Sequence, residues 1–176
     1  HRAEFRPKRI VVIGNSLSAG IGDGAVVWPK LLQKDYGFEV LNLSRAGLRL
    51  RGAIEQAKNV QPSELENSLV ILEIGGNDIL ARRDADVFRR ELEELLNLVA
   101  APGRTLFLFE LPLPPFHNRY AEAQRTLSSK YNVILIPKNT LTGIIGKPGA
   151  TIDGLHFSQA GHHLMADIIY KIVSGG

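Results

Sequence analysis

Short apolar runs rich in β-branched residues alternate along this chain with segments that have the periodicity of amphipathic helices. The runs predicted as strands cover residues 9–13, 38–43, 69–74, 105–109 and 133–136. Helical segments follow them at 27–36, 50–60, 84–100, 119–130 and after Ser158. Because strands joined by helices through short connections are typical of βαβ units, the pattern predicts a three-layer α/β/α sandwich around a five-stranded parallel sheet.

The length of 176 residues suits a single domain. We expect a short basic lead-in over residues 1–8 and one domain over residues 9–176. The chain has no cysteine, which excludes a disulfide scaffold, a zinc ribbon and a thiolate nucleophile. No stretch reaches the roughly 18 apolar residues of a membrane-spanning helix, so no transmembrane segment is expected.

The net charge of +3 does not indicate a nucleic-acid partner. Nucleic-acid binders usually gather basic residues on one face or in one tail, with aromatic residues for stacking. Here basic and acidic residues are interleaved, as where Arg89 and Arg90 precede Glu91. Since the chain starts at His1 and not at Met, we expect an exported, periplasmic protein whose targeting segment has been removed, with a cytoplasmic location as the alternative.

Polar residues collect where the predicted strands end and before the last helix. The segments concerned are 14–20, 44–47, 75–78 and 153–156. In an open parallel sheet these loops converge at one edge. Together they supply a hydroxyl, a glycine amide, a side-chain amide, an imidazole and a carboxylate, which are the components of acyl transfer.

Each of these groups has a chemical role that its position suggests. Ser16 follows a strand directly, so its hydroxyl can act as a nucleophile and its N–H as an oxyanion donor. Gly47 lacks a Cβ, so its N–H can approach a substrate oxygen, and the Asn77 amide can donate to the same oxygen. His156 can accept the Ser16 proton, and Asp153, one tight turn earlier, can orient the imidazole.

These segments resemble the four sequence blocks of the SGNH hydrolases, also called the GDSL esterase/lipase family. The matching residues are Gly14-Asn15-Ser16-Leu17, Gly47, Gly75-Gly76-Asn77-Asp78 and Asp153-x-x-His156. The resemblance extends over nearly the whole chain and implies a flavodoxin-like sandwich. It also implies hydrolysis of esters or thioesters without metal or cofactor. The implied site is a triad of Ser16, Asp153 and His156 with an oxyanion hole of Ser16, Gly47 and Asn77. Small bacterial members similar to this chain include lysophospholipase/thioesterase and arylesterase types.

One position departs from the family pattern, because Asn15 stands where the family usually has Asp. Asn is nearly isosteric and can accept hydrogen bonds through Oδ1, so we expect activity to survive. The residues expected to contact the substrate are Asn15, Arg45, Asp78, Ile79 and Phe116.

Arginines border both loops that would supply the second and third oxyanion donors. Arg45 and Arg49 flank Gly47, and Arg82 and Arg83 follow the Asn77 block. They are either solvated surface or a means of attracting an anionic group on the substrate. The predicted partner is therefore a small-molecule ester, with an anionic or lipid-derived ester as the sharper hypothesis.

The function predicted from sequence is a serine hydrolase that cleaves carboxylic esters or thioesters through an acyl-enzyme on Ser16. A carbohydrate O-acetyl esterase would share the same site. A catalytically silent ligand-binding domain of the same fold is the second alternative. We predict no metal, since His162 and His163 lack a carboxylate partner at helical spacing. We also predict no bound nucleotide, since residues 14–20 lack both a P-loop and a Gly-x-Gly-x-x-Gly motif.

Overall fold

The computed structural model describes residues 6–113 and 117–175. Its strands are β1 (Arg9–Gly14), β2 (Val40–Asn42), β3 (Ser68–Glu73), β4 (Thr105–Phe109) and β5 (Ile134–Ile136). Its helices are α1 (Ser16–Ala19), α2 (Trp28–Tyr36), α3 (Leu50–Asn59), α4 (Pro62–Leu65), α5 (Gly76–Leu80), α6 (Ala85–Val99), α7 (Asn118–Lys130), α8 (Lys138–Ile145) and α9 (Gln159–Ser174). All strand pairs are parallel, in the order β2-β1-β3-β4-β5. The predicted sandwich is confirmed.

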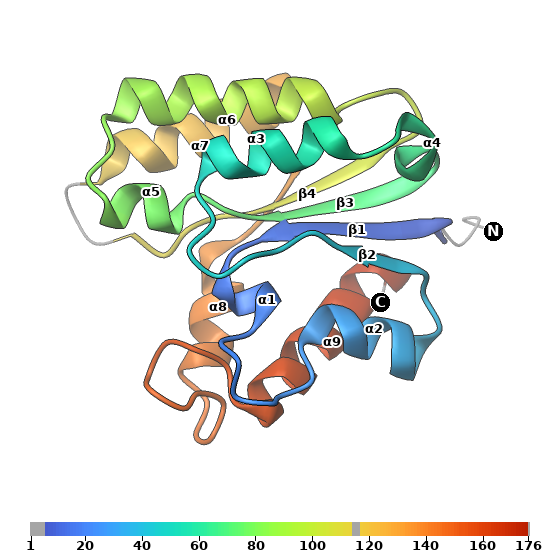
Figure 1. Cartoon of the computed structure of the whole chain (residues 1–176). Helices are drawn as coiled ribbons and strands as arrows, with labels where there is room; N and C mark the ends of the chain where they lie inside the picture. The colour runs from blue at the N-terminus through green and yellow to red at the C-terminus, as the bar shows by residue number, and fades with distance from the viewer. Residues whose placement is uncertain (1–5, 114–116, 176) are drawn as a thin grey trace.

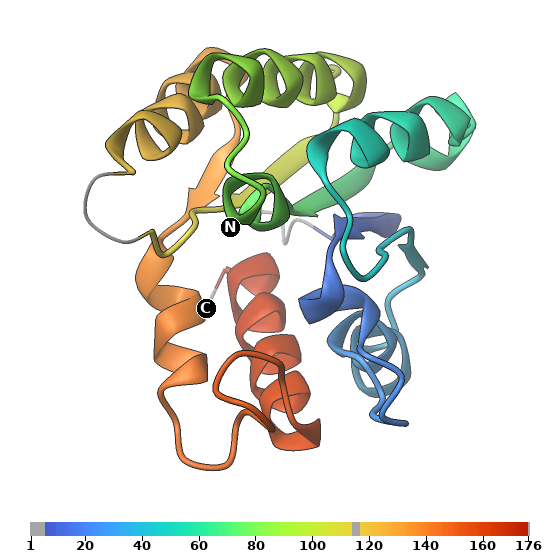
Figure 2. The same ribbon diagram turned by 60° about the vertical axis from the view of Figure 1, so that its left-hand side comes forward.

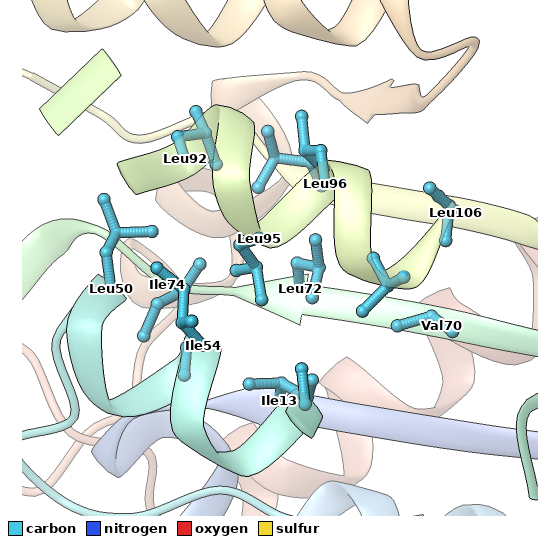
Figure 3. Close-up of a cluster of buried hydrophobic side chains, with 14 of the residues drawn as sticks. Ile13, Leu50, Ile54, Val70, Leu72, Ile74, Leu92, Leu95, Leu96 and Leu106 are labelled. Carbon is cyan, nitrogen blue, oxygen red and sulfur yellow. The ribbon is translucent and has the colours of Figure 1, made fainter. Parts of the chain in front are cut away.

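Helices lie on both faces of the sheet (Figure 1), and a hydrophobic core fills the space between the sheet and the helices on each face. Alternate side chains of each strand point to opposite faces, so Ile10 and Val12 enter one core whereas Val11 and Ile13 enter the other. Helices α3, α6 and α7 cover one face, and Figure 3 shows apolar side chains of α3, α6 and the sheet that are buried there. On the other face α9 lies between α8 and α2 (Figure 2). The central strand β3 is buried along its whole length.

The strand order creates the place for a site. The chain leaves β1 toward β2 at one edge and returns through β3 on the other side of β1. The connections that follow β1 and β3 therefore run to opposite faces of the sheet, and such a switch point at the carboxyl ends of the strands is where open parallel sheets usually place their sites. Helices α1 and α5 begin on the two sides of this switch point.

The structure differs from the sequence prediction mainly in short helices. The segment between β5 and Phe157, expected to be irregular, contains α8. Its sequence includes Asn139, Thr142 and Gly143, which are weak helix formers, so only the burial of Leu141 and Ile144 on one face marks it as a helix. The single-turn helices α1, α4 and α5 lie in segments expected to be loops. No helix within the described residues is long and apolar enough to cross a membrane.

Candidate active site

Ser16 is the first residue of α1, and only Asn15 separates it from the end of β1. The Asn15 side chain caps this short helix, because its Oδ1 accepts a hydrogen bond from the Leu17 N–H at 3.1 Å. Ser16 is half-buried, and neither its hydroxyl nor its N–H is bonded to another of the residues that the structure describes. Both groups are therefore free to meet a substrate, as a nucleophile and an oxyanion donor require.

The capping contact gives Asn15 a definite role that does not need a negative charge. Replacing Asn15 with Asp keeps an Oδ1 acceptor for Leu17, so we expect kcat for an aryl ester within about threefold of wild type. Replacing it with Ala removes the cap, at a cost of about 1 kcal/mol, and should lower kcat much further by loosening α1. Steady-state kinetics and thermal unfolding of the two variants check this. Equal activity in both would contradict a capping role.

Gly47 lies in an exposed turn beside the end of β1. Arg45 N–H donates to the Gly14 carbonyl at 3.0 Å, and Leu48 N–H closes the turn on the Arg45 carbonyl at 3.1 Å. The φ of Gly47 is +78°, a left-handed conformation that a side chain would strain. Within the described residues its N–H has no acceptor, so this amide too is free.

Asn77 and Asp78 of α5 hold that turn through hydrogen bonds to its backbone. The Asn77 amide donates to the Leu48 carbonyl at 3.1 Å, which leaves its second N–H for an oxyanion. Asp78 Oδ2 accepts from the Leu50 N–H at 3.0 Å. Burial raises the pKa of Asp78, and the Leu50 hydrogen bond opposes that effect. Two adjacent side chains thus fix the Gly47 turn relative to α5.

Asp153 and His156 form a compact hydrogen-bonded turn before α9. His156 Nδ1 lies 2.5 Å from Asp153 Oδ2, and Asp153 Oδ1 accepts from the N–H groups of His156 at 2.6 Å and Leu155 at 2.9 Å. These bonds to His156 and Leu155 lower the pKa of Asp153 to about 2. The carboxylate therefore stays ionised at working pH and holds Nδ1 as a donor, which leaves Nε2 as the free acceptor.

The start of α9 is bonded to the segment that follows α1. Gln159 accepts from the Val26 N–H at 2.8 Å and donates to the Val26 carbonyl at 2.9 Å. His162 Nδ1 accepts from the Trp28 N–H at 3.2 Å, and burial lowers the pKa of this imidazole. These contacts join the chain next to His156 with the chain that continues from Ser16. Sequence reasoning did not identify Gln159, whose partner is 133 residues away.

The remaining expected substrate contacts differ in their surroundings. Asp78 is buried and bonded to backbone, so its geometry favours support of the Gly47 turn over contact with substrate. Ile79 is half-buried against the core, Arg45 is exposed, and Phe116 lies outside the described residues. No hydrogen bond joins Ser16 Oγ to His156 within the described part of the chain, as is common where no substrate is bound.

Comparisons with known proteins identify the family of the chain. Residues 12–164 match the model of the GDSL-like lipase/acylhydrolase family. Esterase TesA of Pseudomonas aeruginosa is 30% identical over 161 residues, which cover 84% of this chain and 78% of that protein.

Solved structures extend the likeness to the fold. A crystal structure of TesA superposes with a TM-score of 0.78 at 27% identity, covering 95% of this chain and 98% of that one. The psychrotrophic esterase EstA from Pseudoalteromonas sp., inhibited by monoethylphosphonate, has a TM-score of 0.78 at 24% identity over 93% and 95% of the two chains. The chain belongs to the GDSL-like lipase/acylhydrolase family and is a carboxylic ester hydrolase of the SGNH type.

Proposed function

We propose that this hydrolase cleaves carboxylic ester or thioester bonds through an acyl-enzyme on Ser16. The Asp153–His156 pair carries the proposal, because a carboxylate that is ionised near neutral pH and lies on Nδ1 leaves Nε2 as the base. As Ser16 Oγ attacks the carbonyl carbon, its proton moves to Nε2. The imidazolium then returns that proton to the leaving alcohol or thiol as the carbonyl–leaving-group bond breaks.

Three N–H donors would stabilise the charge that develops on the carbonyl oxygen. Ser16 N–H and Gly47 N–H are both free, and Asn77 has one amide hydrogen left after its bond to Leu48. Donors held rigidly in this way are worth about 10²- to 10³-fold each in kcat. A water molecule then attacks the acyl carbon and gives its proton to Nε2. The imidazolium passes that proton to Ser16 Oγ as the bond between Oγ and the acyl group breaks and the acid is released.

A mechanism-based phosphonate ester tests the proposal directly. Wild-type protein should take up one equivalent, with the adduct on the peptide that contains Ser16, and a Ser16→Ala variant should take up none. Mass spectrometry of the digested protein gives both results. No adduct on folded wild-type protein would indicate the silent binding domain instead, and an adduct on another residue would refute the assignment of Ser16.

The surface around the site supports an ester that bears both an acyl chain and an anionic group. Among the exposed large apolar side chains, four lie within six residues of a candidate site residue: Ile21, Leu80, Ile152 and Leu155. Arg45, Arg49 and Arg82 are exposed next to the Gly47 turn and α5, whereas Arg83 is bonded to Glu91 at 2.8 Å. Exposed cations beside a site attract anions over a distance set by ionic strength.

Esters of equal acyl length with neutral and anionic leaving groups test this substrate preference. We expect kcat/KM at low salt to favour the anionic ester by about three- to tenfold, and the preference to shrink as salt is added. A combined Arg45→Gln and Arg49→Gln variant should lose the preference, whereas Arg89→Gln on α6 should keep it. Equal values for both esters that do not depend on salt would exclude this role for the arginines.

A further inference from the structure

A buried carboxyl group lies beneath the helix that carries Ser16. Glu73 is the last residue of β3 and is only 2% exposed. Its Oε1 accepts a hydrogen bond from the Ser18 hydroxyl at 2.8 Å. Gly14, its partner on β1, makes room for this contact, since a Cβ there would lie 2.7 Å from Ser18 Oγ and 3.0 Å from Glu73 Oε1. The absence of a side chain at Gly14 thus allows the Glu73–Ser18 hydrogen bond.

This hydrogen bond acts on α1 itself. The helix has only four residues, and a single helical turn is not stable on its own. Its position therefore depends on contacts from outside, which include the packing of Leu17 against the core, the Asn15 cap, the bond from Asn42 Nδ2 to the Ser18 carbonyl at 3.1 Å, and the Glu73–Ser18 bond. Ser18 is buried and Ser16 is not, so Glu73 holds the inner side of the helix whose outer side presents the nucleophile.

The charges near Glu73 do not favour its ionised form. Burial raises its pKa from 4.5 to about 8, and only the Ser18 hydroxyl and the Asn15 amide oppose that effect. None of the titratable side chains on neighbouring elements is among the interactions that shift it. The titratable residues on the elements that follow the strands and at the start of α9 are Asp78 in α5, Glu110 after β4, Lys138 in α8, and Asp153, His156 and His162. A carboxylate buried without a cation is costly, whereas the neutral acid can keep the Ser18 bond.

We propose that Glu73 is a positioning residue for ester hydrolysis, which as a neutral carboxylic acid holds α1 through Ser18 and so fixes the Ser16 hydroxyl and N–H. The inference rests on the proposed role of Ser16. Ionisation of Glu73 would place a buried negative charge beneath α1, whose Ser16 N–H must stabilise the oxyanion. Turnover should therefore fall at alkaline pH.

Three variants of the full chain separate positioning from simple stability. Glu73→Gln keeps a neutral acceptor for Ser18, so kcat near pH 7 should stay within about threefold of wild type. Glu73→Ala and Ser18→Ala each break the bond, and a displaced nucleophile should lower kcat by about 10- to 100-fold with KM within about threefold. Ser68→Ala is the matched control, because Ser68 is equally buried at the other end of β3 and bonds the Leu65 carbonyl. It should lower stability and leave kcat unchanged.

The pH profile and the thermal stability test the neutral state. Between pH 6 and 9.5 wild-type kcat should fall through about pH 8, and Glu73→Gln should abolish that fall. The unfolded chain releases the Glu73 proton near pH 4.5 and the folded chain near pH 8, so wild type loses stability as pH rises through this window. The unfolding temperature of Glu73→Gln should therefore exceed that of wild type by a margin that widens from pH 4.5 to 8.

Each contrary result has a clear meaning. Wild-type kcat in both Glu73→Ala and Ser18→Ala, or an alkaline fall that persists in Glu73→Gln, overturns the inference. If the difference in unfolding temperature between Glu73→Gln and wild type does not vary with pH, Glu73 is not a neutral acid in the folded protein. Phosphonate labelling separates these outcomes from failure of the proposed function. If wild-type protein is not labelled at Ser16, the proposed function fails. If it is labelled there as fast in Glu73→Ala as in wild type, the positioning role fails.

Discussion

Replacing Ser16 with Ala should lower kcat for a short-chain aryl ester by about 10⁴- to 10⁶-fold. The nucleophile would be lost, and a water molecule in its place would be neither held nor activated by His156. The fold should not change, because the Ser16 hydroxyl is not bonded to any other described residue and Ala favours a helix. The unfolding temperature should stay within about 2 °C of wild type. Steady-state ester assays measure the loss of kcat, and a thermal melt measures the unfolding temperature.

An exposed serine on another helix provides the control for this experiment. Ser129 lies on α7, and its replacement by Ala should leave both turnover and the unfolding temperature at wild-type values. Turnover by Ser16→Ala within tenfold of wild type would mean that another group attacks the ester. A large drop in unfolding temperature would instead mean that Ser16 supports the fold.

The sheet could be predicted from sequence because its signal is local. The central residues of β1 and β3 are buried on both faces and are mostly apolar and β-branched, and α6 carries a clear apolar stripe. Single-turn helices have no such signal. Helix α1 depends on a cap at Asn15 and on the distant side chains of Glu73 and Asn42, none of which is visible as periodicity.

The loops of the candidate site could also be predicted from sequence, but the contacts that hold them could not. Loops that follow the strands of one parallel sheet converge at its carboxyl edge, which is why Gly47 and Asn77 could be assigned to one site. The structure adds the bonds that fix them, such as that from Asn77 to Leu48. Contacts between residues far apart in sequence, such as that of Gln159 with Val26, give no local pattern.

The charge of Glu73 stands out in the sequence, but the role of this residue cannot be derived from the sequence alone. It is the one charged residue in the apolar run from Leu69 to Ile74, and a charge in a strand buried on both faces needs an explanation. Composition cannot say whether such a residue pairs with a cation or stays neutral. Only the packing of Gly14 and Ser18 against it decides between the two.

The second large effect is expected when Asp153 is replaced by Asn. In the wild-type turn, Asp153 accepts three hydrogen bonds, two from backbone and one from His156 Nδ1. Asn can keep the backbone bonds through Oδ1, but its amide N–H would then face Nδ1. The imidazole would turn to the tautomer protonated at Nε2, which cannot accept the Ser16 proton. Comparable substitutions in a serine triad lower kcat about 10⁴-fold, and we expect a loss of about 10³- to 10⁴-fold with KM little changed.

A double variant and a control variant test whether Asp153 acts through the tautomer of His156. Because Ser16, His156 and Asp153 would act as one unit, the Ser16→Ala/Asp153→Asn double variant should be no slower than Ser16→Ala alone. Asp167→Asn is the control, since Asp167 is also exposed and accepts one side-chain bond, from the Tyr36 hydroxyl, yet belongs to no part of the site. It should keep wild-type turnover. If Asp153→Asn retained more than a tenth of wild-type kcat, or if its effect added fully to that of Ser16→Ala, then Asp153 would only close the turn and would not orient the base.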